Sequence, residues 1–267
     1  MTTVLDRILA DKRVEIERRK AAVPLEALKR RIAGLPKCRN FFAAMTKANP
    51  RGLNIVAEVK KASPSAGIIR ESFDPVAIAT TYERCGADTI SVLTDEKYFQ
   101  GRLEYLEQVK AAVGLPVLRK DFILDEYQVY EARVAGADAI LLIAEALPVG
   151  RLSDLMILAN QLTLTVLLEV HGTEVLLAVR SMVGFPQQSY SLLGINNRDL
   201  STMQVDLNHT GRLLSMVDQP GRVITESGVR TREDVAKIRR WGVGGVLIGQ
   251  ALCESGDIQA KFRELFG

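Results

Sequence analysis

The sequence is poor in the residues that bind metals or form disulfides, because its 267 residues include only three cysteines and two histidines. Cys38, Cys85 and Cys253 lie far apart and form no CxxC pair, which fits free thiols in a reducing compartment. His171 and His209 belong to no HExxH motif or Cys/His cluster. We therefore expect no metal site, and no Ser-His-Asp or Cys-His nucleophile is suggested.

The sequence also lacks a strong net charge and any long apolar run. Its formal net charge of +3 is too small to predict a nucleic-acid partner. No apolar run approaches the roughly 18 residues that cross a membrane. Residues 1–20 carry charges throughout, unlike a signal peptide. We expect a cytoplasmic protein with neither a membrane nor a nucleic-acid partner, and the sequence leaves its oligomeric state open.

A regular alternation of short apolar runs and amphipathic stretches fills the chain from residue 53 onward. Eight strands, each followed by a helix, predict the α/β class and a (β/α)8 TIM barrel. A doubly wound open sheet is the competing fold, but it usually carries a GxGxxG turn after its first strand, where this chain has charges. Helical periodicity is clearest at 75–85, 103–112, 126–135 and 231–241. The expected strands occupy residues 53–59, 88–94, 116–119, 138–144, 164–170, 190–196, 221–226 and 244–248.

The start of the chain reads as a helical addition to this barrel. Thr3 is placed to cap a helix that runs to Ala22, and Pro24 is placed to open a second helix. These helices either cover the rim of a site or close the apolar end of the barrel, and the sequence leaves both interpretations open. We expect one domain over 1–267, with 1–47 as an N-terminal helical extension and 48–267 as the barrel.

Charged and polar residues stand where the apolar strands end. Glu58 and Lys60 face the same way, because side chains two apart on a strand do so. A polar loop at 61–67, predicted to be mobile, follows them. Charge at the end of a buried strand is costly unless it has a partner or a function, and in a TIM barrel these ends meet at the rim that holds the active site. The other polar ends lie at 119–122, 169–171, 196–199, 226–228 and 249–250.

A phosphate site is one function that this rim favours. Ser227, Gly228 and Gly249 follow the last two strands, where this fold commonly binds phosphate through backbone N–H groups and a short helix. Lys60 could add a cation. The alternative is that both glycines only serve tight turns.

Acid–base chemistry is the other function that the rim favours. Lys120 would lie beside Glu58, Glu169 and Glu226 in one pocket. A lysine next to carboxylates stays protonated and can act as a general acid, and a carboxylate near other carboxylates has a raised pKa. The alternative for Glu169 is a salt bridge to Lys120 without proton transfer.

Several strings at these strand ends are long enough to compare with known families. The string Val-Ala-Glu-Val-Lys-Lys-Ala-Ser-Pro-Ser at 56–65 closely resembles the first-strand signature of the indole-3-glycerol-phosphate synthase family. Leu-Arg-Lys-Asp-Phe-Ile at 118–123 resembles the third-strand motif of that family. The resemblance covers residues 1–265, the helical extension included. Further strings that resemble the family lie at 98–101, 168–171, 194–200 and 226–229.

The resemblance implies a tryptophan-pathway lyase that needs no cofactor or metal. Its small anionic substrate would be 1-(2-carboxyphenylamino)-1-deoxyribulose 5-phosphate, whose indole ring closes with loss of carbon dioxide and water. Lys120 would be the general acid that protonates the substrate carbonyl, and Glu169 would stabilise the cationic intermediate and transfer protons. Glu58 and Asn196 would position and polarise the reacting groups, with Glu58 a candidate for the dehydration step.

The resemblance also implies how the organic part of the substrate is held. Lys60 would bind its anionic groups. Ser63 and Arg198 would contact the side that carries the carboxylate. Phe99 and Phe122 would pack on its aromatic ring.

For the remaining contacts, the resemblance implies a phosphate site beside a polar rim. Ser227, Gly228 and Gly249 would hold the phosphate, and Glu226 would complete the rim. Gln250 stands where some relatives carry a small hydroxyl residue. A phosphate contact from the Gln250 side chain is therefore in doubt, whereas a backbone contact is not.

Two other functions compete with this interpretation. An aldolase-like barrel would use Lys120 as a Schiff-base nucleophile. A non-catalytic phosphate-binding barrel would lack Lys120, Glu58 or Glu169 from the family pattern, and all three are present.

Overall fold

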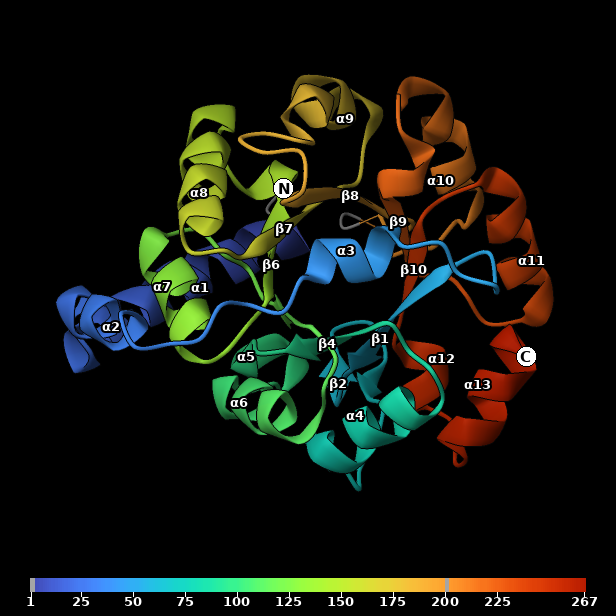
Figure 1. The fold of residues 1–267 in the computed structure, drawn as a ribbon, viewed down its shortest axis with the longest axis horizontal. Coiled ribbons are helices and arrows are strands. Elements are labelled where there is room, and N and C mark those ends of the chain that lie inside the picture. The colour runs from blue at the N-terminus through green and yellow to red at the C-terminus, as the bar shows by residue number, and fades with distance from the viewer. Residues whose placement is uncertain (1–2, 200–201) are drawn as a thin grey trace.

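A closed barrel of parallel strands forms the centre of the molecule. The computed structural model describes residues 3–199 and 202–267, and over these residues eight parallel strands close on themselves, with β1 pairing with both β10 and β4 (Figure 1). The predicted fold class is confirmed, and each strand end lies within two residues of its predicted place. The strands are β1 (Asn54–Val59), β4 (Thr89–Leu93), β5 (Val117–Lys120), β6 (Ala139–Ile143), β7 (Thr165–Val170), β8 (Ser191–Asn196), β9 (Val223–Glu226) and β10 (Gly245–Ile248).

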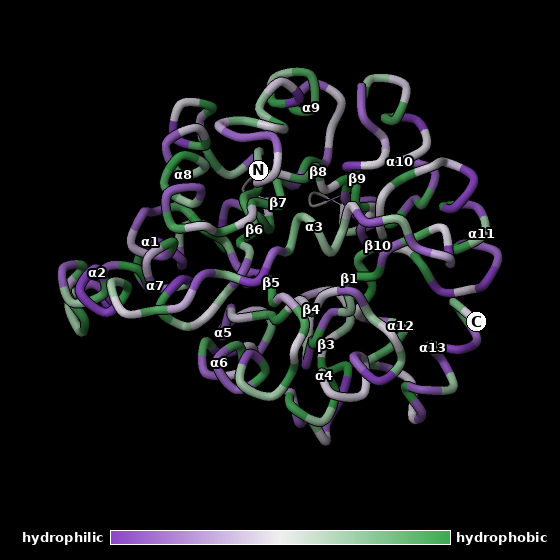
Figure 2. Tube along the Cα trace, viewed as in Figure 1, coloured by the Kyte–Doolittle hydropathy of each residue, from purple (hydrophilic) through white to green (hydrophobic). Residues whose placement is uncertain are grey.

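Helices surround the barrel and bury their apolar faces against it. Figure 2 shows hydrophobic residues gathered on the central strands and hydrophilic residues on the outer turns. Where helices return to strands, Gly86 and Gly136 adopt φ angles of 89° and 91°. Residues other than glycine rarely adopt such positive angles. The surrounding helices are α4 (Pro75–Arg84), α5 (Glu96–Phe99), α6 (Leu103–Ala112), α7 (Glu126–Val134), α8 (Val149–Gln161), α9 (Thr173–Val179), α10 (Asn208–Leu213), α11 (Arg232–Trp241), α12 (Gln250–Cys253) and α13 (Ile258–Phe266).

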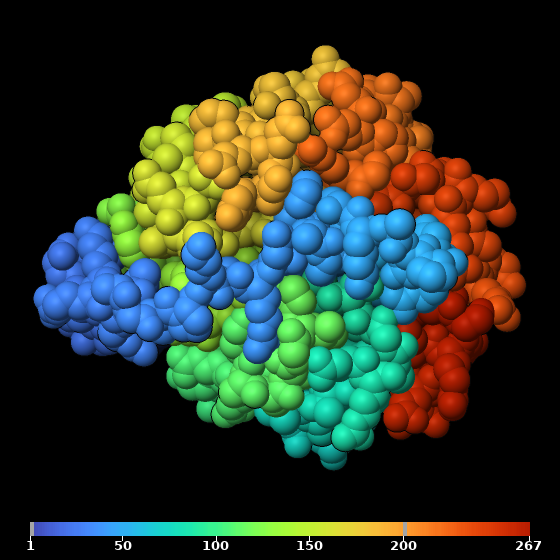
Figure 3. Space-filling model, viewed as in Figure 1, coloured from blue at the N-terminus to red at the C-terminus, as the bar shows by residue number. Residues whose placement is uncertain are grey.

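The N-terminal helices divide between the two ends of the barrel. Thr3 caps α1 (Val4–Ala22) through a capping box, as predicted, and α2 (Leu25–Ile32) follows Pro24. The next helix, α3 (Phe41–Thr46), crosses the amino-terminal end of the barrel, where the carbonyl of Met45 accepts a hydrogen bond from Asn54 Nδ2 at 3.0 Å (Figures 1 and 3). The start of α1 lies at the opposite end. Both interpretations of the extension therefore hold, each for a different helix, while its separation at residue 47 stays a prediction.

Two buried aspartates organise the amino-terminal end of the barrel. Asp88 and Asp138 end the two identical Gly-Ala-Asp strings, one before β4 and one before β6. Asp88 Oδ2 accepts the backbone N–H of Ile55 at 2.9 Å, and Asp138 Oδ2 accepts that of Val117 at 2.8 Å. Each carboxylate thus binds the backbone of the preceding strand, which gives the repeated string a structural reason.

The segment after β1 holds more structure than a polar loop. A short antiparallel hairpin forms there from β2 (Ala62–Ser63) and β3 (Gly67–Ile68). Just beyond it, the Arg70 guanidinium donates to the carbonyls of Cys253 and Ser255 at 3.2 and 3.0 Å. The predicted polar loop thus contains a short ladder of two residue pairs, and Arg70 joins the segment to the end of α12. Its predicted mobility stays a prediction.

The structure bears on two expectations, that the cysteines are free and that no segment crosses a membrane. All three cysteines are free thiols. Among residues 3–199 and 202–267, no helix has both the length and the apolar character that crossing a membrane requires.

We predict that Asp138→Ala lowers the free energy of unfolding by about 3 kcal/mol, because it leaves buried donors without their acceptor. Asp138 also accepts from the Arg39 backbone N–H at 2.6 Å and pairs with Lys110 at 2.5 Å. Urea denaturation followed by circular dichroism measures the change. Asp154→Ala, at an exposed position of α8, is the control and should shift stability by less than about 0.5 kcal/mol. Equal effects of the two variants would contradict the role of Asp138.

Candidate active site

The carboxyl ends of the strands surround a cavity of about 530 Å³. Every residue that the sequence analysis assigned to catalysis or binding lines this cavity, whereas their individual roles stay predictions. They come from β1, β5, β7, β8, β9 and the segments that follow these strands, from the residue after β10, and from α5 and α12. The set is Glu58, Lys60, Ser63, Phe99, Lys120, Phe122, Glu169, Asn196, Arg198, Glu226, Ser227, Gly228, Gly249 and Gln250.

A lysine held between two glutamates occupies the floor of the cavity. Lys120 Nζ lies 2.6 Å from Glu169 Oε2 and 2.7 Å from Glu226 Oε2. The three side chains come from the last residue of β5, the fifth of β7 and the last of β9, so the closed barrel brings them together. All three are largely buried, which strengthens their mutual attraction relative to a pair in water.

The pKa values in this cluster diverge because of burial and neighbouring charge. Burial alone would lower the pKa of Lys120, but attraction from Glu169 and Glu226 outweighs it and holds that pKa well above its ordinary value. Burial would raise the pKa of Glu169, but Lys120 and His171 hold it well below its usual range. Burial and repulsion from Glu169 raise the pKa of Glu226 to about 8. At neutral pH the cluster therefore combines an ammonium, a carboxylate and a protonated carboxyl group.

Two glycines make room for the carboxyl groups. A Cβ atom at Gly194 would lie 2.4 Å from Glu226 Oε1, and one at Gly249 would lie 2.4 Å from Glu58 Oε1. Neither distance is compatible with a side chain at the glycine. Close approach of a phosphate was the predicted reason for Gly249. The structure adds a second reason, which is the space that Glu58 occupies.

The pair at the end of β1 forms a second ionic contact on the same rim. Lys60 Nζ lies 2.6 Å from Glu58 Oε1. Across the cavity, Asn196 Oδ1 accepts the backbone N–H of Arg198 at 3.0 Å, and the Arg198 guanidinium donates to the carbonyl of Met203 at 3.1 Å. These bonds fix the segment after β8, whose family-like string continues to Leu200, a residue outside the described ranges.

One wall of the cavity is apolar. The rings of Phe99 and Phe122 lie with their centroids 6.1 Å apart, and both line the cavity. Val4, Leu5 and Ile8 of α1 line it as well. An aromatic group bound here would therefore contact the two phenylalanines and the first turns of α1, opposite the charged floor.

The segments after β9 and β10 bring backbone groups and the Arg230 side chain to the cavity. Ser227 and Gly228 adopt φ angles of 65° and 94°, a left-handed turn that leads the chain away from β9. Gln250 opens α12, but its side chain donates to Glu254 Oε1 at 2.5 Å, along its own helix. This geometry fits the doubt about a side-chain phosphate contact at Gln250.

The comparisons with known proteins agree with this site. Residues 5–265 match the family model described as indole-3-glycerol phosphate synthase. The chain belongs to the indole-3-glycerol phosphate synthase family. Proteins of that name to which it is similar include one from Rhodopirellula baltica, 46% identical over 98% of both chains. Another, from Geobacillus thermodenitrificans, is 47% identical over 99% of this chain and 97% of the relative, and one from Neisseria gonorrhoeae is 46% identical over 100% of both.

Solved structures outside the indole-3-glycerol phosphate synthase family share the barrel. A chain from the tryptophan synthase a2b2 complex of Pyrococcus furiosus has a TM-score of 0.56 at 16% identity, over 80% of this chain and 97% of that one. A thiamine phosphate pyrophosphorylase from the same organism has a TM-score of 0.57 at 16% identity, over 81% and 96%. Likeness at this identity shows the fold alone.

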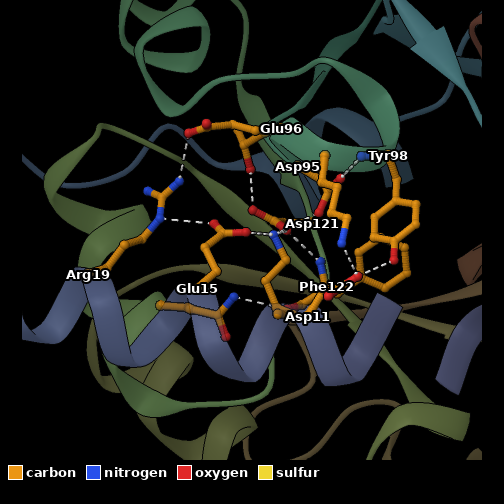
Figure 4. A network of polar contacts seen from close by, with 12 residues as sticks. Asp11, Glu15, Arg19, Asp95, Glu96, Tyr98, Asp121 and Phe122 are labelled. Atoms are coloured by element: carbon orange, nitrogen blue, oxygen red, sulfur yellow. Dashed lines mark hydrogen bonds and ion pairs between the residues drawn. The ribbon is translucent and has the colours of Figure 1, made fainter. Parts of the chain in front are cut away.

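A buried network that the sequence analysis missed holds α1 against the rim of this family member. Lys12 is 1% exposed, and its ammonium lies 2.8 Å from Asp95 Oδ2 and 2.9 Å from Asp121 Oδ1. Figure 4 shows Glu15 and Arg19 of the same helix pointing toward Glu96 and Asp121. Asp121 directly follows Lys120, so the network joins α1 to the strand that carries the lysine of the cluster.

A signal for this network was present in the sequence. Lys12 lies four residues from Ile8 and four from Ile16, so it stands on the apolar stripe of α1, where a charge needs a buried partner. The partners, Asp95 and Asp121, are too distant in sequence for any pattern to pair them. Arg230 and Val205, which also line the cavity, gave no comparable signal.

We predict that Gly194→Ala lowers kcat/KM by about 10- to 100-fold, because the new methyl group displaces Glu226 from Lys120, and displacements near 1 Å can cost about 100-fold. Indole-product kinetics measure the loss. Gly150→Ala, where a Cβ meets no atom within 4 Å, is the matched control and should keep wild-type kinetics. Wild-type activity in Gly194→Ala would show that the position of Glu226 does not matter.

Proposed function

We propose that this chain closes the indole ring of 1-(2-carboxyphenylamino)-1-deoxyribulose 5-phosphate, with loss of carbon dioxide and water, in tryptophan biosynthesis. The observation that carries the proposal is the buried Lys120 ammonium between Glu169 and Glu226, at 2.6 and 2.7 Å, facing a cavity with one apolar wall. It supplies a proton donor and adjacent carboxylates where an aromatic keto-sugar phosphate would bind. Membership of the indole-3-glycerol phosphate synthase family supports the same reaction.

In the first step the ring carbon that bears the carboxylate attacks the substrate ketone. A carbon–carbon bond forms, and the carbonyl oxygen takes a proton from Lys120 and becomes a hydroxyl group. The ring is then cationic, and the ionised Glu169 stabilises that charge. Because Lys120 lies against Glu169, one side chain can give a proton while the other compensates the charge that develops.

The later steps restore the aromatic ring and remove water. The bond to the carboxylate breaks, carbon dioxide leaves, and the electron pair neutralises the ring. The new hydroxyl group then leaves as water after taking a proton, and the neighbouring carbon loses one, which completes the indole. Glu58 is the candidate for this dehydration, with Asn196 polarising the reacting groups and Glu169 transferring protons.

The rest of the rim would bind the substrate. Lys60 would attract its anionic groups, with Ser63 and Arg198 on the carboxylate side. The aromatic ring would pack on Phe99 and Phe122, whose centroids lie 6.1 Å apart, so that they form one apolar surface. The backbone N–H groups after β9 and β10 would hold the phosphate, at Ser227, Gly228, Gly249 and Gln250.

The charge state of Lys120 argues against the aldolase alternative. A Schiff base requires a neutral amine, and nucleophilic lysines are usually desolvated or placed beside another cation. Here attraction from Glu169 and Glu226 outweighs burial and raises the pKa of Lys120. The structure therefore favours Lys120 as an acid.

The proposed compartment follows from the same function. A biosynthetic enzyme with a small phosphorylated substrate and three free cysteines suits the reducing cytoplasm.

The proposed reaction is tested by following indole absorbance with the purified full chain and the carboxyphenylamino deoxyribulose phosphate, with and without a chelator. We expect turnover that the chelator does not change. Covalent trapping of Lys120 by borohydride with a keto-sugar phosphate, without indole formation, would support the aldolase instead.

We predict that Lys120→Met lowers kcat by about 100- to 10,000-fold, the usual contribution of one general acid. Binding of a substrate-like phosphate, measured by calorimetry, should stay within about tenfold of wild type, because the phosphate site is built from other segments. Lys261→Met, in a surface pair 2.7 Å from Glu264, is the control and should leave kcat unchanged. A fully active Lys120→Met would remove the lysine from the mechanism.

We predict that kcat falls as the pH rises through about 8, the raised pKa of Glu226. Below that pH Glu226 is protonated and carries no charge. Above it, a second carboxylate faces Lys120, holds the lysine proton more tightly and repels the anionic substrate. Glu226→Gln keeps the neutral form at every pH, so its profile should lose this decline, whereas an unchanged decline would assign it to another group.

A further inference from the structure

A histidine lies between two glutamates just outside the cavity. His171 follows β7 directly, and its ring Nδ1 lies 3.1 Å from Glu145 Oε2. Its Nε2 lies 3.2 Å from Oε1 of Glu169, the oxygen that Lys120 does not use. The Glu169 carboxylate therefore has a cation on each side, Lys120 toward the cavity and His171 behind it.

The two contacts of the ring determine its protonation. In a neutral imidazole one nitrogen carries a lone pair and no hydrogen. Both ring nitrogens of His171 lie within 3.2 Å of a carboxylate oxygen, but only Nδ1 makes a directed hydrogen bond, to Glu145. Two carboxylates this close to a buried ring stabilise the imidazolium form over the neutral form. The geometry therefore favours a positively charged side chain.

Glu145 clamps this histidine from two directions. Its Oε2 faces the ring, and its Oε1 accepts the backbone N–H of His171 at 2.7 Å. The placement follows from strand register, because Ile143 pairs with Glu169 across β6 and β7, and Glu145 and His171 each lie two residues further on. One carboxylate thus fixes both the main chain and the ring of the same residue.

The charges around His171 agree with this arrangement. Burial alone would lower the pKa of His171, but its contacts with Glu145 and Glu169 raise it to about 10. On the α10 side, His209 interacts with His171, and burial lowers the pKa of His209. Burial raises the pKa of Glu169, but Lys120 has the largest lowering effect and His171 the next largest, so that the pKa is held low.

We propose that His171, held by Glu145, is a positioning residue that keeps Glu169 ionised and aimed at Lys120. His171 is not among the residues that line the cavity, so it would act on the reaction through Glu169. The kinetic part of this inference rests on the proposed function, whereas the charge of the ring does not. Lys120 alone would leave one oxygen of a buried carboxylate facing no cation.

Nuclear magnetic resonance of the histidine rings tests the charge directly, without any turnover. The chain has two histidines, so ring labelling gives two signals, and His209→Asn assigns them. We expect the His171 signal to titrate near pH 10 and the His209 signal below 6.5. Glu145→Gln keeps an acceptor for the backbone N–H but removes a charge, and should lower the His171 titration by about one unit or more. Titration of His171 near 6.5 in the wild type, or no shift in Glu145→Gln, would overturn the inference.

Kinetics test the effect on Glu169. In His171→Asn the acidic decline of kcat should move up by about one pH unit, because Glu169 has lost a cation, and one unit corresponds to about tenfold at a given pH below the new pKa. His209→Asn is the matched control and should keep the wild-type profile. Glu145→Gln should shift the decline in the same direction but less. An unmoved decline in both His171→Asn and Glu145→Gln would overturn the positioning role.

The design separates two kinds of failure. If the wild type does not form indole, the proposed function fails, and the resonance titration still decides whether Glu145 and Glu169 hold a charged His171. If the wild type is active and the titration is normal, only the inference about His171 fails. The urea midpoint of each variant identifies any loss of folding, and Glu145→Gln provides a second variant should His171→Asn not fold.

Discussion

The single ammonium group of Lys120 is the interaction on which the rest of the site depends. Glu169 and Glu226 are buried side by side at one cavity, and carboxyl groups placed together away from water would oppose folding without a cation between them. Lys120 joins strands β5, β7 and β9 through contacts of 2.6 and 2.7 Å. Lys120 and His171 hold the pKa of Glu169 low, while burial and repulsion from Glu169 raise that of Glu226, so one glutamate is ionised and the other protonated at neutral pH, as acid–base chemistry there requires.

The barrel keeps stability and chemistry at opposite ends. At the amino-terminal end, Asp88 and Asp138 bind backbone groups of neighbouring strands and α3 covers the opening. At the other end, Lys60 pairs with Glu58 and Lys120 with Glu169 and Glu226, and these charged groups face a cavity. Such a division is general in this fold, and it allows the site to hold costly buried charge while the opposite end contributes stability.

Much of this arrangement could be predicted from the sequence because the signals are local. Apolar runs predicted the strands, and charges at the ends of these runs predicted the site residues Glu58, Lys120, Glu169 and Glu226. The strings that resemble the family signatures then implied the reaction. The hairpin of β2 and β3 could not be predicted, because strands of two residues carry no period.

Other features depend on contacts between residues far apart in the chain. That Gly194 must lack a side chain depends on Glu226, a residue on the next strand of the barrel. The role of Glu145 depends on its contacts with His171, which the register of β6 and β7 places beside it. The position of Lys12 on the apolar stripe of α1 indicates a buried partner, but only the fold identifies that partner as Asp95 and Asp121. No propensity or spacing carries that information, since it arises when the barrel closes.

The attachment of α1 also has a consequence for the order of assembly. Lys12 precedes its partners Asp95 and Asp121 in the chain, and these two come together only when β4 and β5 are paired. The buried contacts of Lys12 therefore cannot form before that pairing, and Val4, Leu5 and Ile8 reach the cavity on the same helix. A barrel in which α1 has not docked would have its charged floor and the two phenylalanines but lack the part of the apolar wall that α1 supplies.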